Sequence, residues 1–151
     1  MQEASMQSEG PPLSENERIA ANRAAIFAAL LAERVGRAVV SYTGFADSGG
    51  PEGVRFEMSD GATLDEGAVA LQYSESSRWV DGAWQSAIKQ EDRPLQDAAS
   101  DLAMELVEQQ FGGWDVGDGA EGDVIFDATD GSVTIEHRAY FTDYEYNEVR
   151  L

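Results

Sequence analysis

Apolar residues recur at helical spacing after Ser14, and they predict a helix that runs toward Gly36. Ser14 and Glu17 form a capping-box pattern, which is typical of a helix N-terminus. Gly36 is the expected C-terminal stop. The apolar stripe of this predicted helix consists of Ile19, Ala20, Ala24, Ile26, Phe27, Leu30, Leu31 and Val35.

A second helical pattern follows Asp92 in the segment RPLQDAASDLAMELVEQQ, and Gly112 and Gly113 close it. Its apolar stripe consists of Leu95, Ala98, Ala99, Leu102 and Leu106. The opposite face carries only acids at helical spacing: Asp97, Asp101, Glu105 and Glu108. Like charges one turn apart destabilise a helix by a few tenths of a kcal/mol (roughly 0.2–0.5) per pair, so folding alone does not favour this row.

Short segments rich in β-branched and aromatic residues predict strands. They are AVVSYTGF, VRFEM, AVALQY, DVIFDA, SVTIEHRAYF and, as an edge strand, YEYNEVRL. Residues 74–90, with Trp79 and Trp84, predict an irregular segment in which the tryptophans act as core or loop anchors. The order α-β-β-(β)-α-β-β-(β) indicates an α+β fold with two helices packed on one face of a mainly antiparallel sheet. We expect a single domain over residues 14–151 after a disordered tail, residues 1–13.

Asp130-Gly131 predicts a two-residue type I′ turn between the strands on either side. This turn would pair Phe126 with Ile135 and Val124 with His137, and it would gather the apolar residues on one face. The only histidine then lies on the apolar face, where a buried, hydrogen-bonded role is favoured over catalysis.

Acidic residues outnumber basic residues by 29 to 10, which gives a net charge of −19. Residues 1–45 carry 5 acids and 4 bases, whereas residues 46–151 carry 24 acids and 6 bases. This balance argues against direct binding to nucleic acid or to an anionic membrane. Without cysteine, thiolate chemistry is excluded. The first residues lack the pattern of a signal peptide, so we expect a cytoplasmic protein.

The glycine- and aspartate-rich stretch over residues 112–131 resembles a calcium loop only in composition. With Gly131 at position 6 of an EF-hand loop, Phe126, Ala128 and His137 occupy ligand positions 1, 3 and 12. We therefore predict no metal site and no cofactor. Weak cation binding by Asp115, Asp118 and Glu121 stays open as an alternative.

Motifs of phosphate-binding loops, dinucleotide folds, α/β-hydrolases and zinc proteases do not occur in the chain. An enzyme of unrecognised type, using the Asp47-Ser48 loop or His137, is a further alternative. The sequence favours a protein without catalytic residues.

Two glycine-rich motifs, YTGFADSGGPEG and GGWDVGDGAEGDVIFD, carry a resemblance to a known family. Together they resemble a bacterial family of small acidic proteins that is known only as a domain of unknown function. The resemblance implies an accessory role on plasmids or phages, and it implies no activity and no catalytic residue.

The acid-only row predicts a non-enzymatic interaction protein that binds a basic protein partner. That partner could itself bind nucleic acid, with this chain acting as an inhibitor or nucleic-acid mimic. The expected partner-binding residues are Asp97, Asp101, Glu105, Glu108, Asp115, Asp118 and Glu121.

Overall fold

The computed structural model describes residues 9–10, 14–45, 48–59, 61, 63–112, 119–139 and 145–151. In chain order the elements are β1 (Glu9–Gly10), α1 (Glu15–Ala32), β2 (Val35–Phe45), β3 (Ser48–Met58), β4 (Val69–Val80), β5 (Ala83–Pro94), α2 (Leu95–Gln110), β6 (Ala120–Asp127), β7 (Ser132–Ala139) and β8 (Glu145–Arg150). Of the predicted tail, residues 1–8 and 11–13 lie outside the described residues, and Glu9–Gly10 pair with β5.

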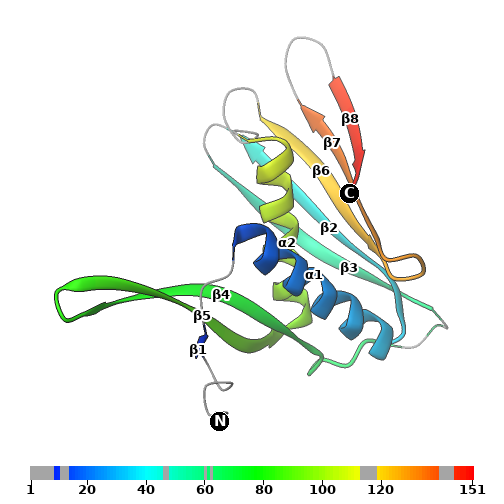
Figure 1. The fold of residues 1–151 in the computed structure, drawn as a ribbon. Helices are drawn as coiled ribbons and strands as arrows, with labels where there is room; N and C mark the ends of the chain where they lie inside the picture. The colour runs from blue at the N-terminus through cyan, green and yellow to red at the C-terminus, as the bar shows by residue number, and fades with distance from the viewer. Residues whose placement is uncertain are drawn as a thin grey trace.

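The strands form two antiparallel sheets, a five-stranded one in the order β3-β2-β6-β7-β8 and a three-stranded one in the order β1-β5-β4. Both helices cover one face of the five-stranded sheet, and the β4–β5 hairpin passes beside them and projects away from the body (Figure 1). The predicted α+β fold and the predicted order of elements are confirmed, with the β4–β5 sheet as an addition.

The core lies between the five-stranded sheet and the two helices. Buried side chains from β2, β6 and β7 meet those of α1 and α2, among them Val40, Phe126, Ile135, Ile26 and Leu102. Alternation along β6 and β7 places every second side chain in this core. The strands therefore fix which residues reach the helices and which reach the opposite face.

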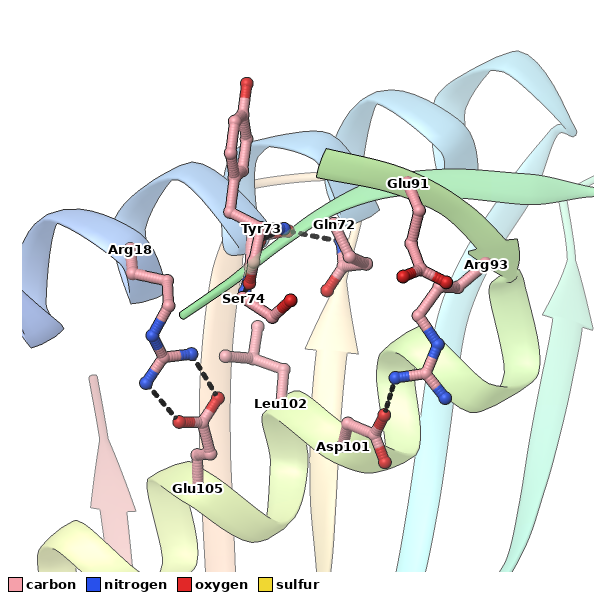
Figure 2. A pocket seen from close by; sticks show the side chains of 10 residues that line it. Arg18, Gln72, Tyr73, Ser74, Glu91, Arg93, Asp101, Leu102 and Glu105 are labelled. Atoms are coloured by element: carbon pink, nitrogen blue, oxygen red, sulfur yellow. Dashed lines mark hydrogen bonds and ion pairs between the residues drawn. The ribbon is translucent and has the colours of Figure 1, made fainter. Parts of the chain in front are cut away.

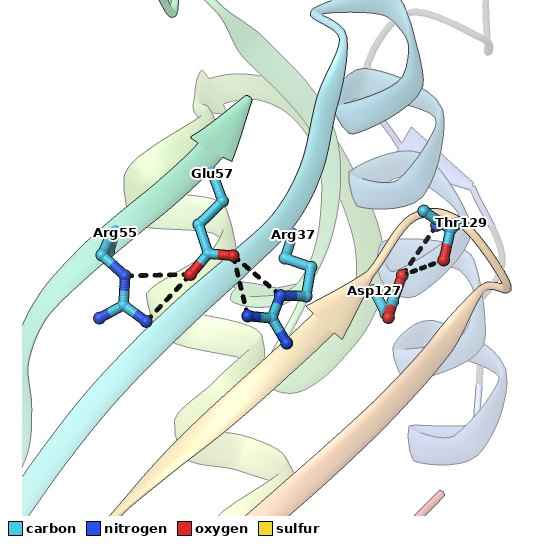
Figure 3. A network of polar contacts seen from close by, with 5 residues as sticks. All are labelled: Arg37, Arg55, Glu57, Asp127 and Thr129. Atoms are coloured by element: carbon cyan, nitrogen blue, oxygen red, sulfur yellow. Dashed lines mark hydrogen bonds and ion pairs between the residues drawn. The ribbon is translucent and has the colours of Figure 1, made fainter. Parts of the chain in front are cut away.

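Polar side chains line that opposite face of the five-stranded sheet. Glu57 on β3 accepts hydrogen bonds from Arg37 on β2 and from its neighbour Arg55, as Figure 3 shows. The two guanidinium groups hold the pKa of Glu57 below its usual value, the hydrogen bond from Arg37 having the largest effect. This face uses basic residues to neutralise its own acids.

Helix α1 begins where the sequence predicts and ends two residues earlier than expected. The Ser14 side chain accepts from the Glu17 backbone N–H at 3.0 Å, and Glu17 accepts from Ser14 N–H at 2.9 Å, which confirms the capping box. Arg34 takes a left-handed conformation with φ 62° and terminates the helix. Gly36, the predicted stop, instead lies within β2, so that prediction is wrong.

Helix α2 buries the predicted stripe, with Leu95, Ala98, Ala99, Leu102 and Leu106 all inaccessible or nearly so. It starts later than predicted because Arg93 and Pro94 remain paired with Ala70 and Val69 of β4. The strand thus runs directly into the helix, with Pro94 as the cap residue.

The β6–β7 hairpin has the predicted faces but a different register. Phe126 pairs with Val133 and Val124 with Ile135, so the strands are shifted by two residues from the prediction. The Asp127 carboxylate accepts from Thr129 N–H at 2.9 Å and holds a longer loop that ends at Gly131, φ 72°. Because a shift of two preserves the side-chain alternation, the buried face is unchanged.

Residues 74–90 form a β-hairpin, and the predicted irregular segment is wrong. Asp81 and Gly82 have φ 50° and 82°, which is the two-residue hairpin geometry that the sequence analysis assigned to Asp130-Gly131. Trp79 and Trp84 lie opposite each other next to this turn, 5.4 Å apart and 77° between planes. They are 60% and 69% exposed, so they stabilise the hairpin tip as a cross-strand pair and do not anchor a core.

One buried amide joins this hairpin to the helices. Asn22 of α1 donates from Nδ2 to the Tyr73 carbonyl at 3.1 Å and accepts the Tyr73 N–H at 2.7 Å. Asn22 is 4% exposed, so its amide lies largely within the protein. The Asn22 side chain therefore pairs with the N–H and C=O groups of Tyr73 in β4, as the backbone of a neighbouring strand would.

Replacing Asn22 by Ala should lower the free energy of unfolding by about 2–4 kcal/mol, because two backbone groups lose buried partners. Urea unfolding measures the loss, and Gln110→Ala, an exposed change at the end of α2, is the control with no expected effect. Hydrogen exchange at the Tyr73 amide should accelerate in the Asn22 variant. Equal stability of the two variants would contradict this account.

Candidate functional site

The acidic face of α2, formed by Asp97, Asp101, Glu105 and Glu108, points away from the core. Two of its carboxylates are held by arginines from other elements. Arg18 of α1 donates to both oxygens of Glu105, at 3.0 and 2.6 Å, and Arg93 of β5 donates to Asp101 (Figure 2). The Glu105 carboxylate raises the pKa of Arg18 still further. The row is therefore acid-only in sequence and partly neutralised in the fold.

The two ends of this face stay exposed. No ion pair reaches Asp97 or Glu108 within the part of the chain that the structure describes. They are eleven residues apart on one helix, a rise of about 16 Å. The acidic face thus offers two unpaired carboxylates that flank two arginine-paired ones.

The remaining predicted site residues do not join this face. Glu121 alternates with the buried Gly122 and Val124, so it lies on the opposite side of the five-stranded sheet, where Arg138 donates to it at 3.2 Å. Asp115 and Asp118 lie outside the described residues. The structure therefore brings together four of the seven predicted residues.

Two hollows border the acidic face of α2. The first, which we call the amide groove, has a volume of about 340 Å³ and lies between α1, α2, β4 and β5 (Figure 2). Both arginine–carboxylate pairs line it, together with Asn22, Gln72, Ser74 and Glu91. The second, between β3 and α2, measures about 320 Å³ and is lined by Glu52, Asp97, Asp101 and Arg93. Carboxylates outnumber basic groups in each.

No group of three His, Cys, Asp or Glu residues able to hold a metal occurs among the residues that the structure describes. Asp115 and Asp118, on which the alternative of weak cation binding rested, are not among them. Asp47 and the side chain of Ser48, which the enzyme alternative invoked, also lie outside the described part.

His137 is 3% exposed and lies on the core side of β7, as predicted. Its Nδ1 is hydrogen-bonded to the Tyr42 hydroxyl at 2.6 Å, and its ring stacks on Phe111 at 4.0 Å. Burial raises the pKa of Tyr42 well above its usual value. The described surroundings of His137 are thus a tyrosine hydroxyl and an aromatic ring, which is the buried, hydrogen-bonded environment expected from the sequence.

Gly122 makes this contact possible. It pairs with Tyr42 on one side and with His137 on the other, so the three residues form a row across β2, β6 and β7. A Cβ at this position would lie 2.5 Å from the Tyr42 hydroxyl and 2.2 Å from the Glu136 carbonyl oxygen. The last glycine of the segment GGWDVGDGAEG therefore lets Tyr42 reach across β6.

A family model described as a family of unknown function, DUF6878, matches residues 18–151. The chain belongs to this family. The expected membership of a family of unknown function is thus confirmed for nearly the whole chain. No curated protein and no solved structure matches the DUF6878 chain.

In this DUF6878 chain, no helix of the described part is long and apolar enough to cross a membrane. The acidic face of α2 is evident from the spacing of its residues in the sequence, whereas the groove residues Gln72, Asn22 and Arg18 are not. They come together through contacts between positions 50 to 87 residues apart, for which no local pattern exists. The segment AVALQY predicted the start of β4, and the Asp81-Gly82 turn was a local signal that could have located the rest of β4 and β5.

Replacing Gly122 by Ala should destabilise the DUF6878 chain by more than about 2 kcal/mol, because the new methyl group overlaps a backbone oxygen and displaces Tyr42. Thermal unfolding measures the effect. Gly53→Ala in β3 is the matched control, since a Cβ there meets nothing within 4 Å. A Gly122 variant as stable as the Gly53 variant would show that the contact has no steric requirement.

Proposed function

We propose that this DUF6878 protein is a non-enzymatic acidic interaction protein that binds a basic protein partner through the acidic face of α2. The charge distribution carries the proposal. Residues 46–151 hold 24 acids and 6 bases, and the described basic residues are largely engaged in pairs with the chain's own acids. The surplus of carboxylates lies at the surface, with Asp97 and Glu108 unpaired within the described part.

The arginine pairs support binding because they hold two carboxylates in place without using all of their acceptor capacity. A carboxylate has about four lone-pair sites, and Arg18 or Arg93 occupies only some of those on Glu105 or Asp101. The Arg93–Asp101 pair is exposed, and such pairs contribute only about 0–1 kcal/mol, so a partner's basic group can share or replace Arg93 at little cost.

Four carboxylates along about 16 Å of helix match the scale of a short basic segment or helix on the partner. Neighbouring carboxylates of the row lie about 5–6 Å apart, a spacing comparable to that of successive phosphates. The basic partners that we propose therefore include proteins that bind nucleic acid. The chain has a net charge of −19, and its long-range attraction for a basic partner makes association fast and salt-sensitive. The setting we propose is the bacterial cytoplasm, with the protein as a mobile-element accessory or inhibitor.

Reversing the two unpaired acids, Asp97→Lys with Glu108→Lys, should reduce capture of the basic partner by about tenfold or more at low salt, because like charges then face each other. The measurement uses the full chain as bait in extract of cells that encode it, with captured proteins quantified by mass spectrometry. Asp101 and Glu105 are left intact because each already has an arginine partner, so reversing either charge would also break an ion pair within the chain.

Glu33→Lys with Glu148→Lys is the matched control, since it changes the net charge by the same amount at positions away from α2. This control should retain capture. Loss of capture in both double variants would reduce the effect to overall charge, and capture of no basic protein at low salt would refute the proposed function.

A further inference from the structure

Gln72 of β4 stands out among the buried polar side chains at the base of the amide groove. It is 7% exposed. Its Nε2 donates to the Leu71 carbonyl at 2.7 Å and to the Asn22 carbonyl at 3.4 Å. Two carbonyl partners on one atom fix that atom as the nitrogen, so the orientation of the amide is determined.

The other end of this amide lacks a partner. Among the residues that the structure describes, no group donates to Gln72 Oε1, and Figure 2 shows this oxygen directed into the groove between Leu102 and the Arg93–Asp101 pair. A buried acceptor without a donor is unfavourable, and a ligand that fills the groove displaces any water from this oxygen. A ligand that donates an N–H here supplies the missing hydrogen bond.

The charges around the groove select the sign of the ligand. The groove is lined by three acids, Glu91, Asp101 and Glu105, and by two bases, Arg18 and Arg93. Its lining therefore carries an excess of one negative charge. Glu15 and Glu75 lie close enough to Arg18 to act on it electrostatically, which increases the excess. Both arginines already donate to carboxylates, so a further cation is favoured over an anion.

The shape fits a chain with an apolar stem and a polar end. Leu102 provides an apolar wall beside the Gln72 carbonyl. The volume of about 340 Å³ falls near the lower limit of small-ligand pockets, which are roughly 300–1,000 Å³. A basic side chain combines such a stem with several N–H donors.

We propose that the amide groove binds the side chain of an arginine or lysine on a partner protein, which donates to Gln72 Oε1 while its charge faces Glu91, Asp101 and Glu105. This inference rests on the proposed function and names the chemistry of one contact within it. The acidic face of α2 attracts the partner, and the groove receives a single basic residue.

Three capped tripeptides test the groove directly: acetyl-Gly-Arg-Gly-amide, its lysine counterpart, and its citrulline counterpart, which has the shape of arginine without the charge. Each is titrated into the full ¹⁵N-labelled chain at about 150 mM salt, and the side-chain amide signals of Gln72 and Asn22 are followed by NMR. We expect saturable shifts of both signals with the arginine or the lysine peptide, and the stronger binder identifies the preferred cation. The citrulline peptide should bind at least tenfold more weakly.

Gln72→Met removes the acceptor with little change in size and should weaken binding of the preferred peptide about tenfold. Glu33→Gln with Glu148→Gln is the control and should change the affinity by less than about threefold, because neither residue lines the amide groove or belongs to the acidic face of α2. If Gln72→Met unfolds, the comparison of arginine with citrulline in the unchanged protein still decides the question.

Equal binding of the arginine and citrulline peptides would overturn the cation requirement. Shifts confined to the surroundings of Asp97 and Glu108 would overturn the groove and leave the proposed function standing. Saturable shifts at Gln72 without capture of a basic protein would support the groove while refuting the role of the acidic face.

Discussion

The relation between the β4–β5 hairpin and the rest of the molecule depends on the buried amide of Asn22. The three-stranded sheet shares no strand pairing with the five-stranded sheet, so backbone hydrogen bonds do not fix their relative position. Asn22 replaces that pairing with two hydrogen bonds to Tyr73, and its own carbonyl accepts from Gln72. Asn22 thus adds to the core packing of Ala70 and to the direct connection of β5 with α2 in holding the hairpin, and it lies at the floor of the amide groove.

The sequence predicted the elements whose periodicity reflects one buried face. Ser14 and Glu17 located the start of α1, and the faces of β6 and β7 were predicted even though the register was shifted by two. The segment AVALQY predicted the first part of β4. The outer half of the β4–β5 hairpin was missed because it projects beyond the core and shows no alternation of buried and exposed side chains. Its stability comes from the Asp81-Gly82 turn and the Trp79–Trp84 pair, and such cross-strand pairing leaves no periodic signal.

In the candidate site, too, features set by neighbouring residues in the sequence were predictable, and contacts between distant residues were not. The row of acids on α2 follows from spacing alone, and the structure confirms that it lies on one helix face. That Arg18 neutralises Glu105 could not be predicted, because the two residues are 87 positions apart and meet only after α1 packs beside α2. Arg18 and Arg93 therefore offset the repulsion within the acidic row, and only Asp97 and Glu108 at its ends have no ion pair among the described residues.

Three polar side chains are buried in the described part of the chain, and they differ in whether the fold satisfies all of their hydrogen-bonding groups. Asn22 satisfies the backbone of β4, and His137 is hydrogen-bonded to Tyr42 in a space that Gly122 leaves open. Gln72 differs, because one end of its amide is satisfied and the other faces a groove edged by carboxylates. Stability alone would favour an apolar side chain there, since an unsatisfied acceptor is costly and the exposed ion pairs around it contribute little. Because no described residue donates to Gln72 Oε1, a bound molecule that donates an N–H in the amide groove would complete the hydrogen bonds of this amide.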